Sequence, residues 1–469
     1  MALASQRADY LGPYSANGEN SPHPAGPWIS APSRTVMPRN FVRIGIANAR
    51  SVESNSDRAG VPGGRRAADM ALTLFTVTEC SRGRPLHAVL VPGVAGAASL
   101  IEPLAAALDG SGPAILPLDA GLPESRLQQL LDAFRPGAVR GAGGDTTIRP
   151  DGQEVSAGTA VIIGTSGSTG APKGVELSAA ALLASARASL ARCGARPGDR
   201  WLACLPVTHV AGLQVLVRSL ASGTEPAIAP AADAASLARS GCAHVSIVPT
   251  QLQRLLDSGT GAAALAKFTS VLVGAAATPP ALLAASRAAG VNVITTYGMS
   301  ETCGGCVYDG VPLDGVTVTE GGDGRLRISG AVLMNGYFGQ PSPLEKGEFV
   351  TSDLGYVRDG RVVVRGRADD VINTGGHKVV PGEVGAVLSD CPGVREVVVV
   401  GRADPEWGER VTAVVVPDDP SEPPGLELLR KHVRERLPRY ACPSELVLTE
   451  SIPVLPSGKP DLAALRSAI

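Results

Sequence analysis

The sequence is poor in the residues that mark several large classes of protein. Aromatic residues make up 3% of the 469 positions, and 42 Lys and Arg nearly balance 44 Asp and Glu. The resulting net charge of −2 provides no basic surface for nucleic acid, so we expect no such partner. The most apolar region, residues 89–101, is broken by Pro92 and several glycines, which makes it too short to cross a bilayer. We therefore expect no membrane insertion.

Paired cysteines are almost absent. Of eight cysteines, only Cys303 and Cys306 stand in a C-x-x-C spacing, and no second pair or nearby His completes a metal set. We interpret this pair as coincidence rather than a zinc or redox site. The scattered cysteines predict a reduced, cytoplasmic protein, and a homodimer is compatible with the sequence.

Length and composition predict two or three domains preceded by a tail. A chain of 469 residues exceeds one ordinary core, and 44% hydrophobic residues suffice for globular folding. Residues 1–68, rich in Ser, Asn, Pro, Gly and Arg, are interpreted as a disordered tail or as a misassigned start, with Met70 the true beginning. A transit peptide is the weaker alternative, because acidic residues are scattered through this stretch.

From about residue 85, short apolar runs alternate with stretches of helical spacing. The runs lie at residues 87–91, 114–116, 160–163, 201–205, 244–248, 271–273 and 291–295. Helices are expected after Ser178, a suitable N-cap, and after Pro249 and Pro279. This alternation predicts an α/β fold in which a large N-terminal domain has mostly parallel sheets.

The alternation of apolar runs with stretches of helical spacing ends near residue 310. Short strands with Gly-rich turns at residues 324–330 and 361–365 predict a small antiparallel subdomain. Beyond a hinge near Asp369, we expect a helix after Pro381, strands at 396–400 and 411–416, and a helix over 426–437. The last hundred residues are thus predicted to form a small, mobile α+β lid.

Residues 164–174 read Gly-Thr-Ser-Gly-Ser-Thr-Gly-Ala-Pro-Lys-Gly and directly follow an apolar stretch. Backbone N–H groups and hydroxyls exposed by such a loop suit a polyphosphate, and glycine allows its close approach. The run is not a Walker A loop, because Ala171 and Pro172 separate Gly170 from Lys173. Alone, it would also suit a flexible connection.

Five further motifs follow in a fixed order. They are Thr-Tyr-Gly-Met-Ser-Glu at 296–301, Thr-Ser-Asp-Leu-Gly at 351–355, Gly-Arg-Ala-Asp-Asp at 366–370, Gly-Gly-His-Lys-Val-Val-Pro-Gly-Glu at 375–383 and Pro-Ser-Gly-Lys at 456–459. Over about residues 85–469 this set resembles the adenylate-forming superfamily of acyl- and aryl-CoA synthetases, adenylation domains and luciferases. The resemblance implies a large AMP-binding domain at 70–368, shortened at its N-terminus, and a lid at 369–469.

The resemblance implies a function and a set of site residues. The enzyme would use ATP and Mg²⁺ to convert a small carboxylic acid into an acyl-adenylate, which CoA then turns into a thioester. Thr165 and Glu301 would hold Mg²⁺, and Glu301 counts among the catalytic residues. ATP or AMP would be bound by Thr165, Ser166, Gly167, Ser168, Thr169, Gly170, Lys173, Gly274, Ala275, Ala276, Tyr297, Gly298, Asp353 and Arg367.

The lid would supply the remaining groups. Lys459 is the predicted catalytic cation, neutralising charge between the carboxylate and the α-phosphate. Asp369 matches the hinge position between the two half-reactions. Gly375, Gly376 and Lys378 would form the CoA passage.

Residues 205–218 and 248–256 look like those of the o-succinylbenzoate–CoA ligases of menaquinone synthesis. A dicarboxylate substrate needs one carboxylate for chemistry and the other held by a cation. Arg254 is our first candidate for that cation and Arg218 the second. His209 would gate the acyl pocket and contact the phosphates.

Each assignment has a simpler alternative. Glu301, Arg367 and Lys459 could be solvated surface residues, His209 a structural histidine at a helix start, and Arg254 part of a helix surface. At the level of function, another aryl- or acyl-CoA synthetase and a stand-alone adenylation protein that loads a carrier protein share every motif. A catalytically inactive nucleotide-binding regulator is less favoured, because a relic would be free to lose the charged residues.

Overall fold

The computed structural model describes residues 83–166, 172–455 and 459–469. The chain divides into two units, residues 1–77 and 78–469, and the description below concerns the second. The predicted tail and Met70 lie outside the described residues. Among the described helices, none combines the length and apolar character that crossing a membrane requires.

The first sheet of the described chain has four parallel strands at its centre. Its order is β17-β7-β6-β2-β1-β3-β4, with β5 also paired to β1. The strands are β1 (Arg84–Val91), β2 (Ala114–Asp119), β3 (Ala138–Arg140), β4 (Thr146–Ile148), β5 (Glu154–Val155), β6 (Thr159–Ser166), β7 (Pro172–Ser178) and β17 (Gly336–Tyr337). Strands β6 and β7 form an antiparallel pair on either side of residues 167–171.

The second sheet has the order β14-β13-β12-β11-β10-β8-β9, and five of its strands are parallel. The strands are β8 (Trp201–Ala203), β9 (Ala227–Ile228), β10 (His244–Ile247), β11 (Ser270–Val273), β12 (Val293–Met299), β13 (Gly304–Tyr308) and β14 (Val311–Pro312). The predicted runs are found as strands, with two larger differences in their bounds. β8 ends two residues early, before Pro206, and β12 begins two residues later and ends four residues later than the predicted run 291–295.

Helices cover both faces of these sheets. They are α1 (Ala98–Asp109), α2 (Glu124–Phe134), α3 (Ala179–Arg192), α4 (Val210–Ser222), α5 (Ala234–Arg239), α6 (Pro249–Asp257), α7 (Gly259–Leu265) and α8 (Pro280–Ala288). The predicted starts after Ser178, Pro249 and Pro279 are confirmed for α3, α6 and α8. The Ser178 hydroxyl caps α3 by accepting from the Ala181 backbone N–H at 3.1 Å.

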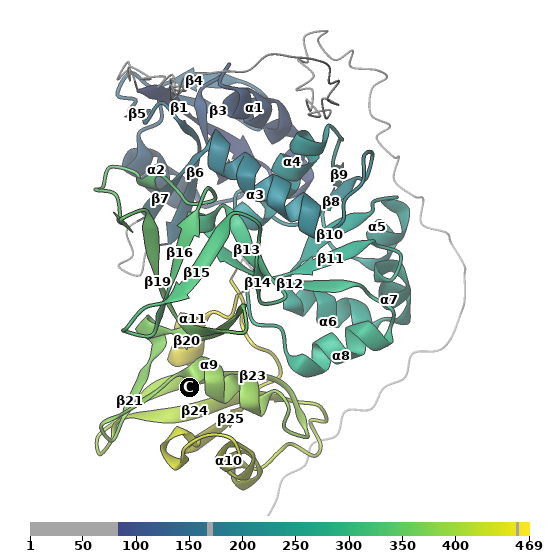
Figure 1. Cartoon of the computed structure of the whole chain (residues 1–469), viewed down its shortest axis with the longest axis vertical. Coiled ribbons are helices and arrows are strands. Elements are labelled where there is room, and N and C mark those ends of the chain that lie inside the picture. Colours follow the sequence, from purple (N-terminus) through teal and green to yellow (C-terminus); the bar gives the residue numbers. More distant parts are fainter. Residues whose placement is uncertain (1–82, 167–171, 456–458) are drawn as a thin grey trace, which may run out of the picture. The chain divides into compact units, whose positions relative to one another are not determined.

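The main core lies between the two sheets, where α3 and α4 are buried by both (Figure 1). Alternation along the strands explains this arrangement: Leu202, Val271 and Val273 face the outer helices α5–α8, whereas Trp201 and Leu272 face the central core. Helix α2 covers the far side of the first sheet. The two-sided burial suits the nearly continuous apolar runs of parallel strands.

The predicted antiparallel subdomain is confirmed as a five-stranded sheet of the order β15-β16-β19-β18, with β20 paired to β19. Its strands are β15 (Val316–Glu320), β16 (Arg325–Gly330), β18 (Leu344–Glu345), β19 (Glu348–Arg358) and β20 (Arg361–Arg367). A one-turn 3-10 helix, Ala368–Asp370, follows β20 at the position of the predicted hinge. The predicted domain boundary there stays a prediction.

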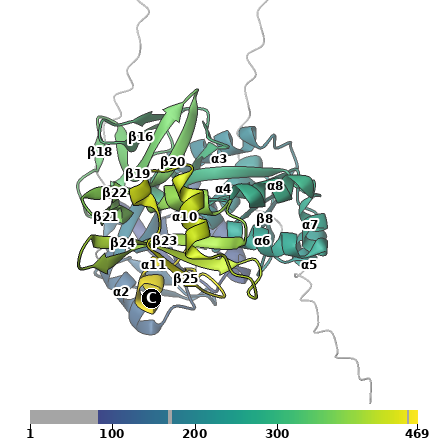
Figure 2. The same ribbon diagram turned by 90° about the horizontal axis from the view of Figure 1, so that it is seen from below.

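The C-terminal part is α+β, with the sheet order β22-β21-β24-β23 and β25 paired to β24 (Figure 2). Its elements are β21 (Ile372–Thr374), β22 (His377–Val379), α9 (Pro381–Leu388), β23 (Val394–Asp404), β24 (Gly408–Pro417), α10 (Leu426–Arg434), β25 (Glu445–Leu448) and α11 (Leu462–Ala468). Helix α10 ends three residues earlier than predicted, because Pro438 disfavours the helical conformation at Leu437. Helices α9 and α10 pack on one face of the sheet and α11 on the other.

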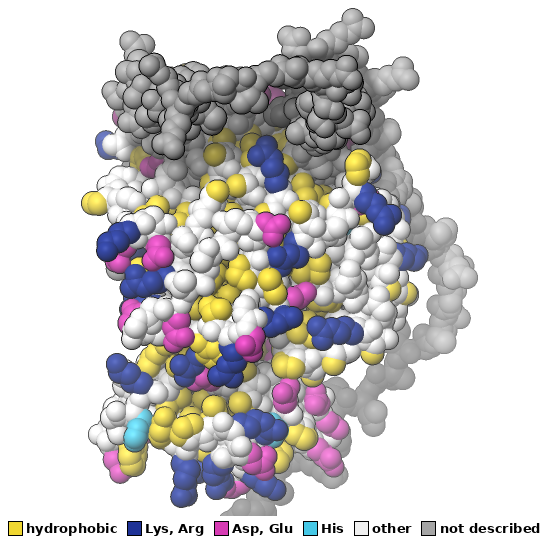
Figure 3. Space-filling model, in the orientation of Figure 1, with side chains coloured by type: hydrophobic (Ala, Val, Ile, Leu, Met, Phe, Trp, Pro, Cys, Tyr) yellow, Lys and Arg dark blue, Asp and Glu magenta, His cyan; other side chains and the backbone are white. Residues whose placement is uncertain are grey.

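Charges of both signs are spread over the surface. On the face shown in Figure 3, acidic and basic side chains are interspersed across the described residues.

Candidate functional site

Four predicted site segments follow the carboxyl ends of neighbouring strands in the second sheet. His209 lies six residues after β8, α6 begins two residues after β10, Gly274 follows β11, and Tyr297 lies within β12. Parallel strands end at the same edge of a sheet, which is where open α/β folds bind ligands. The fold therefore brings together segments that are up to about ninety residues apart in sequence.

His209 is the N-cap of α4 and lines a cavity of about 170 Å³. Gly212, Arg254, Val454 and Leu455 also line this cavity. Burial lowers the pKa of His209, Asp119 raises it, and the nearby Lys459 ammonium lowers it further. Because the net shift is downward, the imidazole of His209 is neutral at pH 7.

Lys459 lies on one of two short arms, residues 453–455 and 459–461, which pair in antiparallel fashion and are called the lysine hairpin here; residues 456–458 lie outside the described residues. Its carbonyl accepts from the Leu455 N–H at 2.8 Å, and Val454 pairs with Pro460. Helix α11 follows immediately, capped by Asp461. The hairpin thus carries the ammonium toward His209 from the C-terminal part of the chain.

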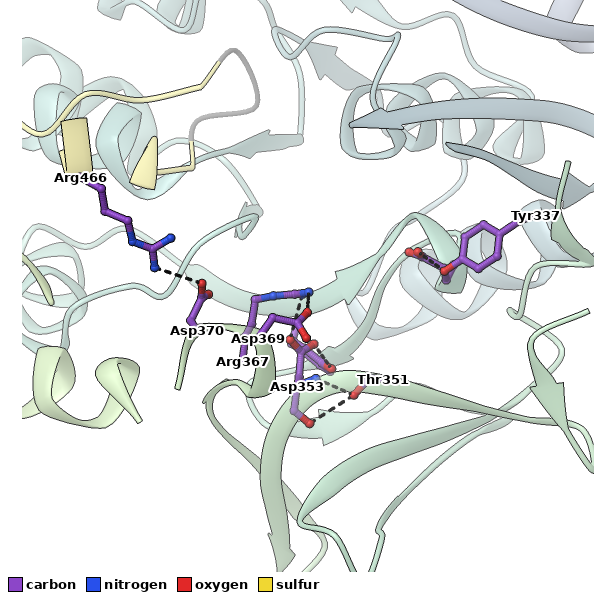
Figure 4. Close-up of polar contacts among 9 residues, drawn as sticks. Tyr337, Thr351, Asp353, Arg367, Asp369, Asp370 and Arg466 are labelled. Carbon is purple, nitrogen blue, oxygen red and sulfur yellow. Dashed lines mark hydrogen bonds and ion pairs between the residues drawn. The ribbon is translucent and has the colours of Figure 1, made fainter. Parts of the chain in front are cut away.

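Asp353 and Arg367 face each other across strands β19 and β20. The Tyr297 hydroxyl donates to Asp353 Oδ2 at 2.7 Å, and Arg367 contacts Asp353 Oδ1 at 3.4 Å. Arg367 also bonds Asp369 at 2.9 Å, so one guanidinium links both carboxylates (Figure 4). Burial and the adjacent Asp353 raise the pKa of Tyr297, which keeps its hydroxyl a donor.

The neighbouring Thr351 fixes the backbone beneath this carboxylate. Its hydroxyl accepts from the Asp353 N–H at 3.0 Å and donates to the Asp353 carbonyl at 3.2 Å. Asp370 continues the cluster toward the C-terminal helix, where it pairs with Arg466 at 3.7 Å (Figure 4). Burial lowers the pKa of Arg367, but Asp353, Asp369 and Asp370 together raise it, so it stays charged.

Glu301 lies in the one-turn 3-10 helix after β12 and is bonded by a tyrosine that sequence reasoning missed. The Tyr337 hydroxyl donates to Glu301 Oε1 at 2.9 Å, and the Lys173 ammonium lies 5.5 Å from the Tyr337 ring centroid. Burial and Glu301 raise the pKa of Tyr337. The sequence did offer a weak indication of this residue. Tyrosine is rare, with seven in 469 residues, and Tyr337 directly follows the turn-forming residues Asn335 and Gly336.

The proposed phosphate loop is described only at its ends. Thr165 and Lys173 are register partners, and the Thr165 hydroxyl donates to the Lys173 carbonyl at 3.2 Å. The predictions for Gly167, Ser168, Thr169 and Gly170, and for the Ser166 side chain, lie outside the described residues.

The segment Gly274 to Ala276, predicted to line the adenine slot, has an unusual backbone. Ala275 has φ of +70°, a left-handed conformation that costs a non-glycine residue about 1–2 kcal/mol. A side chain at Gly274 would meet the Thr296 hydroxyl at 2.1 Å. Gly298 belongs to β12, the strand that runs parallel to β11 next to it. Strain of this kind is typical of ligand-binding positions.

Gly375 and Gly376 form the two-residue turn between β21 and β22, both with positive φ. A Cβ at Gly375 would lie 2.6 Å from the Trp407 ring, and the Gly375 N–H donates to the Trp407 carbonyl at 2.9 Å. Lys378 is exposed on β22. The glycines are therefore required by the turn itself, and the predicted CoA passage stays a prediction.

The two candidate anchors for a substrate carboxylate differ sharply in environment. Arg254 is exposed on α6 and lines the His209 cavity. Arg218 is only 5% exposed, does not line that cavity, and hydrogen-bonds Ser246 at 3.0 Å and Ser189 at 3.3 Å. Its guanidinium lies 4.1 Å from the Trp201 ring centroid. These three partners of Arg218 were not predicted from the sequence.

The described residues hold no group of three or more His, Cys, Asp and Glu side chains suited to a metal ion. Cys303 and Cys306 are both free and fully buried, and burial raises the pKa of Cys306 to about 12. These two thiols are therefore inert at pH 7.

Comparison with known proteins identifies the family. The AMP-binding enzyme family matches residues 145–338, and the AMP-binding enzyme C-terminal domain matches residues 383–459. A probable 2-succinylbenzoate–CoA ligase of Mycobacterium tuberculosis is 40% identical over 395 residues, 81% of this chain and 97% of the relative. The 2-succinylbenzoate–CoA ligase of Bacillus mycoides is 32% identical over 323 residues, 62% of this chain and 66% of the relative.

Solved structures share the fold. Wild-type E. coli MenE, bound to a phenylether-linked analogue of OSB-AMS, has a TM-score of 0.66 at 25% identity, covering 83% of this chain and 89% of that one. ATP-bound MatB from Rhodopseudomonas palustris has a TM-score of 0.71 at 23% identity, covering 82% and 89%, a likeness of fold alone. This chain belongs to the AMP-binding, adenylate-forming enzymes, in the branch that contains the 2-succinylbenzoate–CoA ligases.

Proposed function

We propose that this protein is an AMP-forming acid–thiol ligase that converts 2-succinylbenzoate into its CoA thioester. The observation that carries the proposal is the cavity at the carboxyl edge of the second sheet, which His209 and Arg254 line together with Leu455, four residues before Lys459. The likeness to ligases acting on 2-succinylbenzoate supports that substrate. The pathway would be menaquinone synthesis, as the sequence analysis predicted.

The chemistry has two steps. A carboxylate oxygen attacks the α-phosphorus of ATP, the bond to the bridging oxygen breaks, and pyrophosphate leaves. The thiolate of CoA then attacks the acyl carbon and AMP leaves, with the thiol proton passing to solvent. The first step joins two anions, so it needs cationic groups placed where negative charge builds up. Lys459 supplies one such group beside His209.

The nucleotide would be held by the Asp353 cluster. An ionised carboxylate that already has fixed donors is oriented to accept hydrogen bonds from ribose hydroxyls. Tyr297 and Arg367 provide that orientation in the described structure. Gly274, which packs against Thr296 without room for a side chain, and Ala275, with its left-handed backbone, would line the adenine slot.

The residues present fit Mg²⁺ with ATP. Magnesium usually takes one or two protein carboxylates and completes its shell with phosphates and water, which agrees with a lone carboxylate and no larger acidic cluster among the described residues. Glu301 would hold it together with Thr165, and Tyr337 orients the carboxylate. When bound, Mg²⁺ neutralises phosphate charge.

The free carboxylate of the acid would be bound by an arginine. A buried guanidinium acts in a medium of low dielectric constant, whereas an exposed one is hydrated and screened. On this argument Arg218 becomes the first candidate and Arg254 a second group at the cavity, which reverses our ranking from sequence. An arginine-to-lysine variant of E. coli MenE with bound OSB-AMS is among the solved structures, at 27% identity.

For thioester formation, the C-terminal part would rotate about Asp369 and bring Gly375, Gly376 and Lys378 to the active site. The turn is preformed, and Lys378 is exposed, so its ammonium would be free to contact a phosphate of CoA. Replacing Asp369 with Pro should then slow one half-reaction while sparing the other. Equal rates for both would remove Asp369 from this role.

The deciding experiment is a pyrophosphate-release screen with purified enzyme and ATP-Mg²⁺. The acids are 2-succinylbenzoate, benzoate, cinnamate and short fatty acids, each with and without CoA. We expect release with 2-succinylbenzoate and a CoA thioester detectable by mass. Adenylation without transfer to CoA, but with transfer to a phosphopantetheine carrier, would support the adenylation protein, and tight ATP binding without turnover would support the inactive regulator.

A further inference from the structure

Three side chains form a buried stack in the core between α4 and the second sheet: the guanidinium of Arg218, the indole of Trp201 and the imidazole of His244. The Arg218 Cζ lies 4.1 Å from the Trp201 ring centroid. The Trp201 and His244 rings also stack, with centroids 4.7 Å apart and planes at 27°. Trp201 and His244 are 0% exposed. The three residues come from α4, β8 and β10, so the stack joins the central helix to the second sheet.

The last ring of the stack is fixed in place. His244 Nδ1 hydrogen-bonds the Ser270 hydroxyl at 2.8 Å, and its Nε2 lies 3.4 Å from Asp199. Burial lowers the pKa of His244 more than Asp199 raises it, so the ring is neutral at pH 7. It therefore adds no second positive charge behind Arg218.

Two of the three guanidinium nitrogens of Arg218 donate hydrogen bonds, and the third, Nε, does not. One terminal nitrogen donates to the Ser246 hydroxyl and the other to the Ser189 hydroxyl, while Nε has no hydrogen-bond partner in the described structure. Within residues 83–166, 172–455 and 459–469, no Asp or Glu pairs with Arg218. A buried cation compensated only by hydroxyls and an aromatic face is electrostatically incomplete, and a carboxylate would complete it.

We propose that Trp201, His244 and Ser246 are positioning residues that preset the orientation of the Arg218 guanidinium, and that this platform sets the preference for an acid with a second carboxylate. The inference rests on the proposed function. A long arginine side chain that is already immobilised loses less conformational freedom when it binds an anion. A flexible arginine at the same place would bind the carboxylate more weakly.

The competing explanation is that the stack serves only to hold α4 on the sheet. The two explanations differ in which kinetic quantity changes. A purely structural stack affects every substrate and the thermal midpoint alike. A positioning platform affects the dicarboxylate alone, because an acid without the second carboxylate makes no use of Arg218.

The test compares 2-succinylbenzoate with its two mono-acids, which lack either the ring or the chain carboxylate. Whichever mono-acid is still adenylated retains the reacting group and reports on chemistry without the anchor. The variants are Trp201→Leu, Trp201→Phe and Ser246→Ala. The matched control is Leu216→Ala, a buried position on α4, the helix that carries Arg218. Each is assayed by pyrophosphate release for kcat and KM of the acids and of ATP, with Tm measured in parallel.

We expect Trp201→Leu to raise KM for 2-succinylbenzoate about tenfold, with KM for ATP and kcat/KM for the mono-acid within about twofold of wild type. Trp201→Phe should recover most of the loss, because it keeps an aromatic face. Leu216→Ala should lower Tm without changing the ratio of kcat/KM between dicarboxylate and mono-acid. If Trp201→Leu proves too unstable, Ser246→Ala should reduce that ratio about threefold.

An unchanged ratio in Trp201→Leu and Ser246→Ala would overturn the inference and leave the proposed function standing. So would a loss shared equally by all substrates. Failure of the wild-type enzyme to adenylate 2-succinylbenzoate would overturn the proposed function, and the inference with it.

Discussion

The two sides of the candidate site treat charge in opposite ways. On the proposed nucleotide side, Asp353 is already bonded by Tyr297 and Arg367, and Arg367 also reaches Asp369. On the proposed acid side, Arg218 is buried with hydroxyl partners and an open Nε, and Arg254 is exposed at a cavity. On the nucleotide side the charged side chains are paired before any ligand binds. On the acid side, no carboxylate of the described residues pairs with either arginine.

This difference suggests a division of labour. Matched charges hold groups in place for a ligand that binds through neutral hydroxyls, as ribose does. An unmatched buried cation favours an anionic ligand and rejects a neutral one, because burial without a partner is costly. The predictions below test whether the two sides fail separately, from the largest expected effect to the smallest.

Lys459→Ala should affect both sides at once, because in the proposed mechanism the ammonium would act at the reacting centre. We expect adenylation to fall by a factor of about 10²–10³, as for the loss of one charge-stabilising donor. Pyrophosphate exchange measures this step. Thioester formation from supplied acyl-adenylate should stay near wild type, and normal exchange in the variant would remove Lys459 from catalysis.

Asp353→Asn should affect the nucleotide side alone. It removes the charge that pairs with Arg367 and weakens the bond from Tyr297, so KM for ATP should rise about tenfold or more. KM for the acid should change less than about threefold. Asp323→Asn, an exposed turn position of the same antiparallel sheet, is the matched control. Equal rises in both KM values would contradict the separation.

Arg218→Lys and Arg254→Lys together rank the two anchors. Both keep the charge, but lysine cannot form a bidentate pair. We expect about a tenfold rise in KM for 2-succinylbenzoate in Arg218→Lys and less than about threefold in Arg254→Lys, with ATP unaffected. The reverse order, measured by the same steady-state assay, would restore Arg254 as the principal anchor.

The smallest effect concerns pH. Burial lowers the pKa of His244 below its ordinary value of 6.5. As the pH falls below 6.5, the imidazole is therefore protonated in the unfolded chain before it is protonated in the folded protein. Stability from the neutral ring is therefore complete above about pH 6.5 and is lost as the pH falls. Asp199 and Arg218 face this ring with opposite effects. We expect Tm to drop from about pH 6.5 to 5, and less steeply in His244→Gln.

A Tm that stays flat over this range would mean that the folded protein binds this proton as readily as the unfolded chain, so that the pKa of His244 is not lowered. The stack would then gain a second cation next to Arg218 as the pH falls below about 6.5, and the contrast between the two sides would need revision there.

Sequence reasoning predicted the elements that depend on local patterns. The α/β order, the helices after Ser178, Pro249 and Pro279, and the antiparallel subdomain all follow from periodicity and capping, and the structure confirms them. The end of α10 was set too late, because the pattern of Leu429, Val433 and Leu437 continues past the point where Pro438 stops the helix. At this point the apolar spacing predicts that the helix continues, whereas the proline that follows disfavours helical backbone.

The site was only partly accessible to sequence reasoning. Asp353 and Arg367 were named from their motifs, but their direct pairing depends on a strand register that no local pattern reveals. Tyr337, Trp201 and His244 were missed, because their roles arise from contacts between segments far apart in the chain. Arg218 was ranked second for the same reason: its burial is a property of the assembled core.

The ion pair between Arg466 and Asp370 has a practical consequence. The final helix begins three residues after Lys459 and contacts the residue next to the proposed hinge, so the chain end couples the lysine hairpin to the pivot. Deleting the last eight residues should uncouple the two and cost activity even where the rest folds normally. An affinity tag placed beyond Ile469 should be tolerated far better than such a truncation.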